Sequence, residues 1–188
     1  MSVSTLTPAE VIALRRQGVS AVARAAQRHP GGFHTLPGGV PVLSSLVGAY
    51  VRVPWWRALL TAICWVESKG DPQAVSTTGA LGPMQLTSSL YYYTKPSINP
   101  FQWGPALRRA VAVLQGLYQR AEGVAEPGED AIDIALAAWK EGWDGSQRPE
   151  RQKVASHFVT EVRETLDEWF PSWEPELPLG QIVVTEGW

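Results

Sequence analysis

The sequence predicts a mainly α-helical domain, and three segments carry that prediction. Apolar residues recur every three or four positions over residues 54–68, 105–120 and 149–169, a spacing that places them on one face of a helix. Each segment begins with a proline, a residue that suits the first turn of a helix. The chain has 188 residues, of which 45% are hydrophobic, so it is long and apolar enough to bury a core.

The first 53 residues form a predicted N-terminal appendage. A capping box marks the start of a helix over residues 7–17, and a second helix is expected over residues 19–28. We interpret the second as a solvated helix, with a contact arm toward a larger assembly as the alternative. Residues 29–41 are rich in glycine and proline and predict a hinge, after which residues 42–51 form a short apolar helix.

The central domain, expected over residues 54–169, begins with the first long helix. That helix ends before Gly70, which suits the left-handed position that follows a helix. Residues 70–83 carry Gly, Pro, Ser and Thr, so they predict turns with room for a small β-hairpin. Another helix is expected to begin over residues 84–89, and residues 91–100 are expected to form an exposed loop.

Two helices of the second half have clear apolar faces. Their members repeat at helical spacing: Leu107, Val111, Leu114 and Leu117 in one, and Val154, Phe158, Val162 and Leu166 in the other. Between these helices, a turn at residues 126–130 precedes a small-residue helix over residues 131–139. The tail, residues 170–188, contains several prolines and cannot be a regular helix, although residues 181–185 could form a strand.

The composition excludes several classes of function. A formal net charge of −2 offers no basic field for nucleic acid. The single cysteine, Cys64, excludes an internal disulfide and a Cys-based zinc site, and its apolar neighbours predict a core side chain. His29 and His34 have no acidic or cysteine partner at ligand spacing, so they are interpreted as surface residues, and neither a metal nor another cofactor is expected.

The residues that suggest chemistry gather at the end of the first long helix. Glu67 falls on one face with Leu60, Ile63 and Cys64, so a carboxylate is placed on the last turn of an apolar face. Burial disfavours the charged form and raises a carboxyl pKa. A glutamic acid that stays protonated near neutral pH can serve as a general acid in glycoside cleavage. The alternative is a solvated glutamate at a helix end.

The stretch from Glu67 to Gln85 resembles the signature of the soluble, lysozyme-like lytic transglycosylases. The matching parts are Glu67-Ser68 and the pattern Ala-x-Ser-x-x-Gly-Ala-x-Gly-x-Met-Gln at residues 74–85. Its glycines allow tight turns and close approach to a ligand. The resemblance implies a helical fold like that of goose-type lysozyme, and an enzyme that cleaves the glycan strands of peptidoglycan.

A weaker similarity lies at residues 135–142, and the whole resemblance covers residues 55–145. Here Trp139 and Lys140 replace the tyrosine and asparagine that are usual in the family. The indole N–H is only a donor, and a donor or an ammonium near Glu67 would favour the ionised carboxylate and lower its pKa. Either change could lower the pH optimum or weaken activity. Alternatively, Trp139 lies in the core and Lys140 points to solvent.

The resemblance implies that Glu67 acts twice. It first protonates the glycosidic oxygen between N-acetylmuramic acid and N-acetylglucosamine. It then takes the proton of the sugar's own C6 hydroxyl, which closes onto C1 and leaves a 1,6-anhydromuramic end. This attack is intramolecular and gains from proximity, so it needs no second carboxylate. A hydrolytic muramidase would need one, and Asp71, Glu141 and Asp144 are the acids that could serve.

The resemblance also implies contacts with the substrate. The candidate substrate-binding residues are Ser76, Met84, Gln85, Tyr91 and Trp139. Ser76 would face the acetamido group or, alternatively, bond its own turn. Gln85 can donate and accept hydrogen bonds to a sugar, whereas Met84 is expected to pack beneath the site.

Two classes of function remain open: a wall-cleaving enzyme, and a virion structural protein whose lysozyme-like domain binds glycan without cutting it. The start of the chain has neither a charged leader nor an apolar run, so no signal peptide is expected. No stretch has the roughly 20 apolar residues that cross a bilayer. A phage particle or release from the host cytoplasm is therefore the expected route to the bacterial cell wall. The N-terminal helices and the tail are candidate contacts with other virion or wall-complex proteins.

Overall fold

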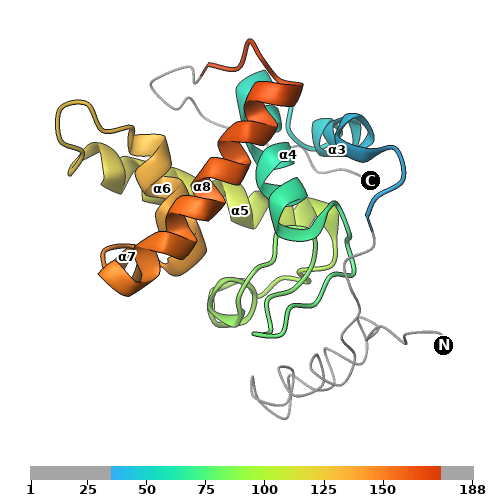
Figure 1. Cartoon of the computed structure of the whole chain (residues 1–188). Helices are drawn as coiled ribbons and strands as arrows, with labels where there is room; N and C mark the ends of the chain where they lie inside the picture. The colour runs from blue at the N-terminus through green and yellow to red at the C-terminus, as the bar shows by residue number, and fades with distance from the viewer. Residues whose placement is uncertain (1–34, 175–188) are drawn as a thin grey trace.

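Helix α4, residues Pro54–Ser68, lies at the centre of a helical bundle in the computed structural model, which describes residues 35–174 (Figure 1). The other elements are α3 (Gly39–Gly48), the π-helix η1 (Ser89–Tyr93), α5 (Trp103–Glu122), α6 (Ala131–Glu141), α7 (Trp143–Ser146) and α8 (Pro149–Trp169). The prediction of a mainly α-helical domain is confirmed. The expected helices over residues 7–17 and 19–28, the two N-terminal histidines and the strand over residues 181–185 lie outside the described residues.

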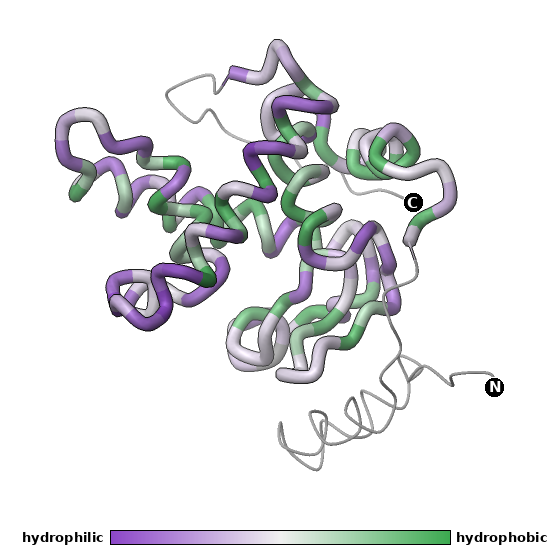
Figure 2. The backbone as a smooth tube through the Cα atoms, in the orientation of Figure 1, coloured by the Kyte–Doolittle hydropathy of each residue, from purple (hydrophilic) through white to green (hydrophobic). Residues whose placement is uncertain are grey.

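The sequence of α4 explains its central position. Ten of its 15 residues are buried, and Figure 2 shows it as a largely hydrophobic segment. Pro54 occupies the first turn, where its missing N–H costs no hydrogen bond. Lys69 (φ 53°) and Gly70 (φ 78°) follow the helix in the left-handed region, and this conformation ends it where the sequence predicted.

Helix α3 packs against α4 and extends the same core. It begins at Gly39, three residues before the predicted start at residue 42. Leu43, Val47 and, beyond the helix, Val51 are fully buried in the cluster that contains the α4 side chains. The division of the chain at residues 53 and 169 stays a prediction, but the last helix of the expected appendage is part of this core.

Helix α6 lies between α5 and α8, and α8 also runs along α4 (Figure 1). The guanidinium of Arg163 on α8 donates to Asp133 of α6 at 2.7 Å and also pairs with Asp130. After α8, the indole N–H of Trp173 donates to the backbone carbonyl of Trp55 at 2.9 Å. The start of the tail is therefore fixed against the first turn of α4.

Two local predictions were only partly right. Residues 84–87 are not helical, because Gln85 is in the left-handed region (φ 46°) and Leu86 exchanges backbone hydrogen bonds of 2.9 and 3.0 Å with Leu81, and the helical turn η1 begins only at Ser89, the end of the expected range. Part of the expected loop over residues 91–100 belongs to η1, which buries Tyr91. The segment between α4 and η1 is otherwise rich in turns, with isolated bridges in place of the expected hairpin.

The apolar face of α8 is rotated relative to its prediction. Phe158, Val162 and Leu166 are buried as expected, but Val154 is 47% exposed and Ala155 is buried instead. The small side chain of Ala155 lets the start of α8 approach the core closely, which leaves the neighbouring valine at the edge. No helix in the described part of the chain is both long and apolar enough to cross a membrane.

Candidate active site

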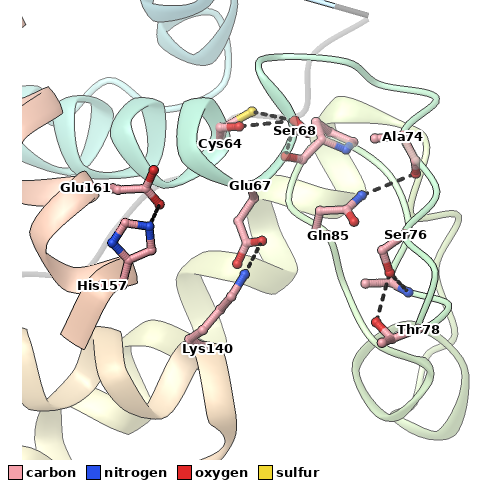
Figure 3. A network of polar contacts seen from close by, with 12 residues as sticks. Cys64, Glu67, Ser68, Ala74, Ser76, Thr78, Gln85, Lys140, His157 and Glu161 are labelled. Atoms are coloured by element: carbon pink, nitrogen blue, oxygen red, sulfur yellow. Dashed lines mark hydrogen bonds and ion pairs between the residues drawn. The ribbon is translucent and has the colours of Figure 1, made fainter. Parts of the chain in front are cut away.

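A cleft of about 690 Å³ opens between the end of α4, the turn-rich segment and the end of α6. One wall carries Glu67, Trp139, Lys140 and Glu141, and the other carries Ser76, Thr78, Gln85 and Thr87. Figure 3 shows the side chain of Glu67 leaving α4 toward Lys140, with Ser76 and Thr78 on the turn-rich segment opposite. The fold thus brings residues 67, 76, 85 and 139 of the sequence prediction to one cavity.

Glu67 lies on the last turn of α4 with its side chain only 9% exposed. Its Oε2 accepts a hydrogen bond from Nζ of Lys140 at 3.0 Å, which makes a salt bridge between α4 and α6. Lys140 is thus exposed in the cleft, but its ammonium contacts Glu67 and not solvent alone. The ammonium also lies 5.0 Å from the ring centroid of Phe158, so cation–π attraction helps to hold it.

Burial raises the pKa of Glu67, and this is the largest influence on it. The charge and hydrogen bond of Lys140 and the indole of Trp139 act in the opposite direction, while the charge of Glu161 adds a smaller increase. The net result is a pKa above the ordinary value of a glutamate. Both expected effects are thus present, and desolvation exceeds the effect of the two donors.

Ser68 fixes the end of α4 to the turn-rich segment. Its buried hydroxyl donates to the carbonyl of Pro83 at 2.8 Å, and the carbonyl of Cys64 is also within reach at 3.1 Å. Cys64 itself is fully buried, which raises the pKa of its thiol to about 12. The cysteine is therefore a neutral core side chain near pH 7, as expected, and the serine sets where the cleft wall lies relative to Glu67.

Ser76 supports its own turn and lines the cleft at the same time. Its Oγ accepts from the backbone N–H of Ala80 at 2.9 Å and lies 3.0 Å from Oγ1 of Thr78. Thr87 and Ser89 form a second hydroxyl pair at 2.8 Å on the same wall. These hydroxyls give the wall opposite Glu67 a polar surface suited to hydrogen bonds with a sugar.

Gln85 is buried in the turn-rich segment, with 8% of its surface exposed. Its Nε2 donates to the carbonyls of Gly82 at 2.9 Å and Ala74 at 3.3 Å. The amide therefore holds the loop together from inside. Since both donor contacts are made to backbone, its Oε1 is the atom that can accept from a ligand in the cleft.

The sequence profile described as transglycosylase SLT domain matches residues 51–153. The chain belongs to this family. Its mainly helical bundle is the lysozyme-like fold of SLT domains. The chain is also 34% identical over 106 residues to membrane-bound lytic murein transglycosylase F of Klebsiella pneumoniae subsp. pneumoniae. That alignment covers 55% of this chain but only 20% of the relative. No solved structure gave a significant match.

Two of the candidate substrate-binding residues are absent from the cleft lining. Met84 is 0% exposed and Tyr91 is 1% exposed, and both belong to the hydrophobic core. Neither side chain is therefore placed to contact a ligand in the cleft. Trp139 is half-buried and lines the cleft. Of the two aromatic residues among the five candidates, it is therefore the one that a glycan can reach.

The three other acids of interest differ in their positions. Glu141 lines the same cleft, is only 9% exposed, and pairs with Arg151 at 2.9 Å. Asp71 is buried, and its Oδ1 caps the backbone N–H of Gln73 at 2.8 Å. Asp144 is exposed on α7 and lies outside the cleft lining. Glu141 is therefore the second carboxylate that shares the cavity with Glu67.

The sequence did not predict the salt bridge between Glu141 and Arg151, and it raised an ammonium near Glu67 without placing it. Glu67 and Lys140 are 73 positions apart, so spacing alone could not reveal that pair. The replacement of the usual asparagine by Lys140 was a signal, but it gave no position for the ammonium. Within the described part of the chain, no group of His, Cys, Asp and Glu side chains could hold a metal ion.

Proposed function

We propose that this SLT domain is a peptidoglycan lytic transglycosylase that cleaves the β-1,4 bond between N-acetylmuramic acid and N-acetylglucosamine. The observation that carries the proposal is Glu67, a nearly buried carboxyl whose raised pKa suits a general acid and which faces a cleft large enough for sugar rings. The name of the Klebsiella relative supports the same reaction.

In the first step, Glu67 gives its proton to the glycosidic oxygen while the bond from that oxygen to C1 breaks. The carboxylate that remains is stabilised by the ammonium of Lys140 at 3.0 Å and by the indole of Trp139. In the second step, the carboxylate accepts the proton of the C6 hydroxyl while the oxygen of that hydroxyl bonds to C1. The glutamate ends protonated, the product is a 1,6-anhydro sugar, and no water is consumed.

The hydroxyl wall would hold the sugar against Glu67. Ser76, Thr78 and Thr87 present hydroxyls to the cleft, and Gln85 can accept through Oε1. Trp139 offers an aromatic surface, and such surfaces suit the apolar faces of sugar rings. Met84 and Tyr91 would support this wall from beneath rather than contact the glycan.

A hydrolytic muramidase is the second candidate, because Glu141 shares the cleft with Glu67. An inverting hydrolase places its two carboxyl groups about 6.5–9.5 Å apart, with the attacking water between them. Arg151 pairs with Glu141 at 2.9 Å and so fixes the position of this second carboxylate. The products separate the candidates, because an anhydro end is lighter by one water than a hydrolysed end.

The test is digestion of purified peptidoglycan followed by mass analysis of the soluble fragments. We expect anhydromuramic ends from the parent protein and a loss of roughly 10²–10⁴-fold in rate for Glu67→Gln, which cannot give a proton. Glu168→Gln, an exposed change on α8, is the matched control and should keep the parent rate. Reducing-end muramic acid that disappears in Glu141→Gln would establish the muramidase instead. If Glu67→Gln cleaved peptidoglycan at the parent rate, Glu67 would not be the general acid in either mechanism.

The proposed place of action is the bacterial cell wall, where peptidoglycan lies. Delivery by a phage particle and release from the host cytoplasm both stay predictions. So do contacts of the N-terminal helices or the tail with other proteins. The test adds the protein from outside to intact cells and, separately, to purified walls. Fragments released from purified walls but not from intact cells would show that a delivery partner is needed.

A further inference from the structure

Lys140 is held between two helices that are distant in the sequence. It is the penultimate residue of α6, and Gly142 (φ 74°) ends the helix just beyond it. Its ammonium lies 3.0 Å from Oε2 of Glu67 on α4 and 5.0 Å from the ring centroid of Phe158 on α8. With its side chain 32% exposed, the amine is fixed on two sides and open to the cleft on another.

We propose that Lys140 is a positioning residue that orients the carboxyl group of Glu67 and sets the upper pH limit of the reaction. The proposal rests on the proposed role of Glu67 as the acid and deepens it by naming what regulates that acid. The salt bridge holds Oε2 against α6 and thereby fixes the orientation of the carboxyl group. A lysine takes this role where the resemblance led us to expect an asparagine, which carries no charge.

The environment makes this pair matter more than a surface ion pair. Glu67 is 9% exposed, so water screens its charge poorly. It also sits on the last turn of α4, where the negative end of the helix dipole disfavours a carboxylate. Lys140 lies at the same end of α6, where the dipole favours a cation. The ammonium thus compensates for two features that would otherwise keep Glu67 protonated.

The other charged groups around Glu67 do not duplicate this effect. From α8, Glu161 adds a like charge, and its own partner is His157 at 3.7 Å. Glu141 on α6 is engaged by Arg151. Cys64, on the same helix as Glu67, is uncharged near neutral pH because burial raises its pKa to about 12.

The remaining neighbours carry no charge toward the carboxyl group. Helix α3 contains no charged residue, and α5 contributes only Val113 and Leu117 to the cleft. The turn-rich segment contributes hydroxyls and the amide of Gln85. Among the residues that the structure describes, Lys140 is therefore the one cation paired with Glu67.

Removing the ammonium should have two opposite consequences. Glu67 must be protonated in the free enzyme, so activity falls as pH rises through its pKa. Without Lys140 that pKa is higher, and the alkaline limb of kcat/KM moves to higher pH. The carboxylate formed in the first step also loses its partner, so the maximal rate falls. A residue with only a structural role would lower the rate at every pH and leave the limb where it was.

The experiment measures kcat/KM for peptidoglycan against pH in the parent, Lys140→Met, Lys140→Arg and Lys153→Met. Methionine keeps a long apolar side chain beside Phe158 and removes the charge, whereas arginine keeps the charge. Lys153 is an exposed lysine on α8, so its variant loses one charge away from the cleft. In Lys140→Met we expect the limb to move to higher pH and the plateau to fall. Both changes should be smaller in Lys140→Arg and absent in Lys153→Met.

A second readout needs no activity. The carbon-13 signal of the Glu67 carboxyl group, assigned by its absence in Glu67→Gln, should titrate at higher pH in Lys140→Met than in the parent. An alkaline limb and a titration that stay in place in Lys140→Met, or that move equally in Lys153→Met, would overturn the proposal. If no variant cleaves peptidoglycan, the proposed function fails, while the titration still decides whether Lys140 controls Glu67.

Discussion

At the scale of single residues, Glu67 is held by two opposing influences. Burial on the last turn of α4 favours the protonated acid, and the salt bridge to Lys140 favours the carboxylate. The reaction proposed for it needs both forms in turn, first as acid and then as base. A carboxyl group that was only buried, or only paired with a cation, would be suited to one of the two steps.

The raised pKa of Glu67 predicts a pH-dependent stability cost. A carboxyl group whose pKa is higher in the folded protein binds its proton more tightly in the folded state than in the unfolded state. The stability that this group contributes is full below its pKa in the unfolded chain, and it is lost as pH rises through its pKa in the folded protein. Glu67→Gln carries no such cost. Its free energy of unfolding relative to the parent should therefore increase between about pH 4 and about pH 8.

Urea unfolding of both proteins at the two pH values measures this difference. Glu168→Gln, on the exposed end of α8, is the control for the loss of one carboxylate and should show no comparable trend. A relative stability of Glu67→Gln that falls with pH would mean that the salt bridge to Lys140 outweighs burial. The sign of the pKa shift would then be the reverse of the one described.

Among the elements, the turn-rich segment is shaped by close backbone contact. Gly82 has φ 75°, and a Cβ atom placed there would lie 1.9 Å from the carbonyl oxygen of Pro100. Its N–H donates to the carbonyl of Ala74 at 2.8 Å. Only glycine fits this approach, and the approach brings the segment around Gln85 against the loop before α5. The glycine of the motif thus has a structural reason that is independent of any ligand.

Gly82→Ala should therefore lower the free energy of unfolding by roughly 2–3 kcal/mol. The matched control is Gly116→Ala in α5, where a new Cβ meets nothing within 4 Å. In a helix interior that change should stabilise the protein by about 0.5–1 kcal/mol. Chemical denaturation of the three proteins checks both signs. Equal stability of Gly82→Ala and the parent would show that the Pro100 loop can move away freely.

At the scale of the whole molecule, the cleft depends on how the helices pack. Glu67 comes from α4, the hydroxyls come from the following segment, and Lys140 comes from α6, which α5 and α8 hold in place. Helix α3 packs against α4 and adds Leu43 and Val47 to the core. Helix α4 is therefore supported by a segment that precedes the predicted domain boundary at residue 53.

Leu43→Ala tests whether α3 unfolds together with the rest of the core. Leu43 is 0% exposed, and truncating a buried leucine to alanine costs roughly 2–5 kcal/mol. We expect that loss in a single cooperative transition, seen equally by far-UV circular dichroism and by tryptophan fluorescence. Two separated transitions, with only a small one affected by the substitution, would instead support a boundary at residue 53.

Much of the helical framework could be predicted because its signals are local. Pro54, Gly70 and the apolar spacing located α4, and Pro149 located the start of α8. The errors arose where neighbours decide the outcome. Leu86 pairs with Leu81 in place of starting a helix, and Tyr91 is buried because η1 turns it into the core. Val154 is exposed because α8 approaches the core through Ala155.

For the site, the sequence by itself determined which residue is the candidate acid, because a glutamate at the end of an apolar face and the glycines that follow it are contiguous features. It also determined that burial should raise the pKa of Glu67. Only the tertiary structure decided what lies across the cleft: Lys140 on Glu67, Arg151 on Glu141, and the hydroxyls of the opposite wall. Electrostatic contacts depend on distance in space, and helix packing sets that distance between residues that are 73 positions apart.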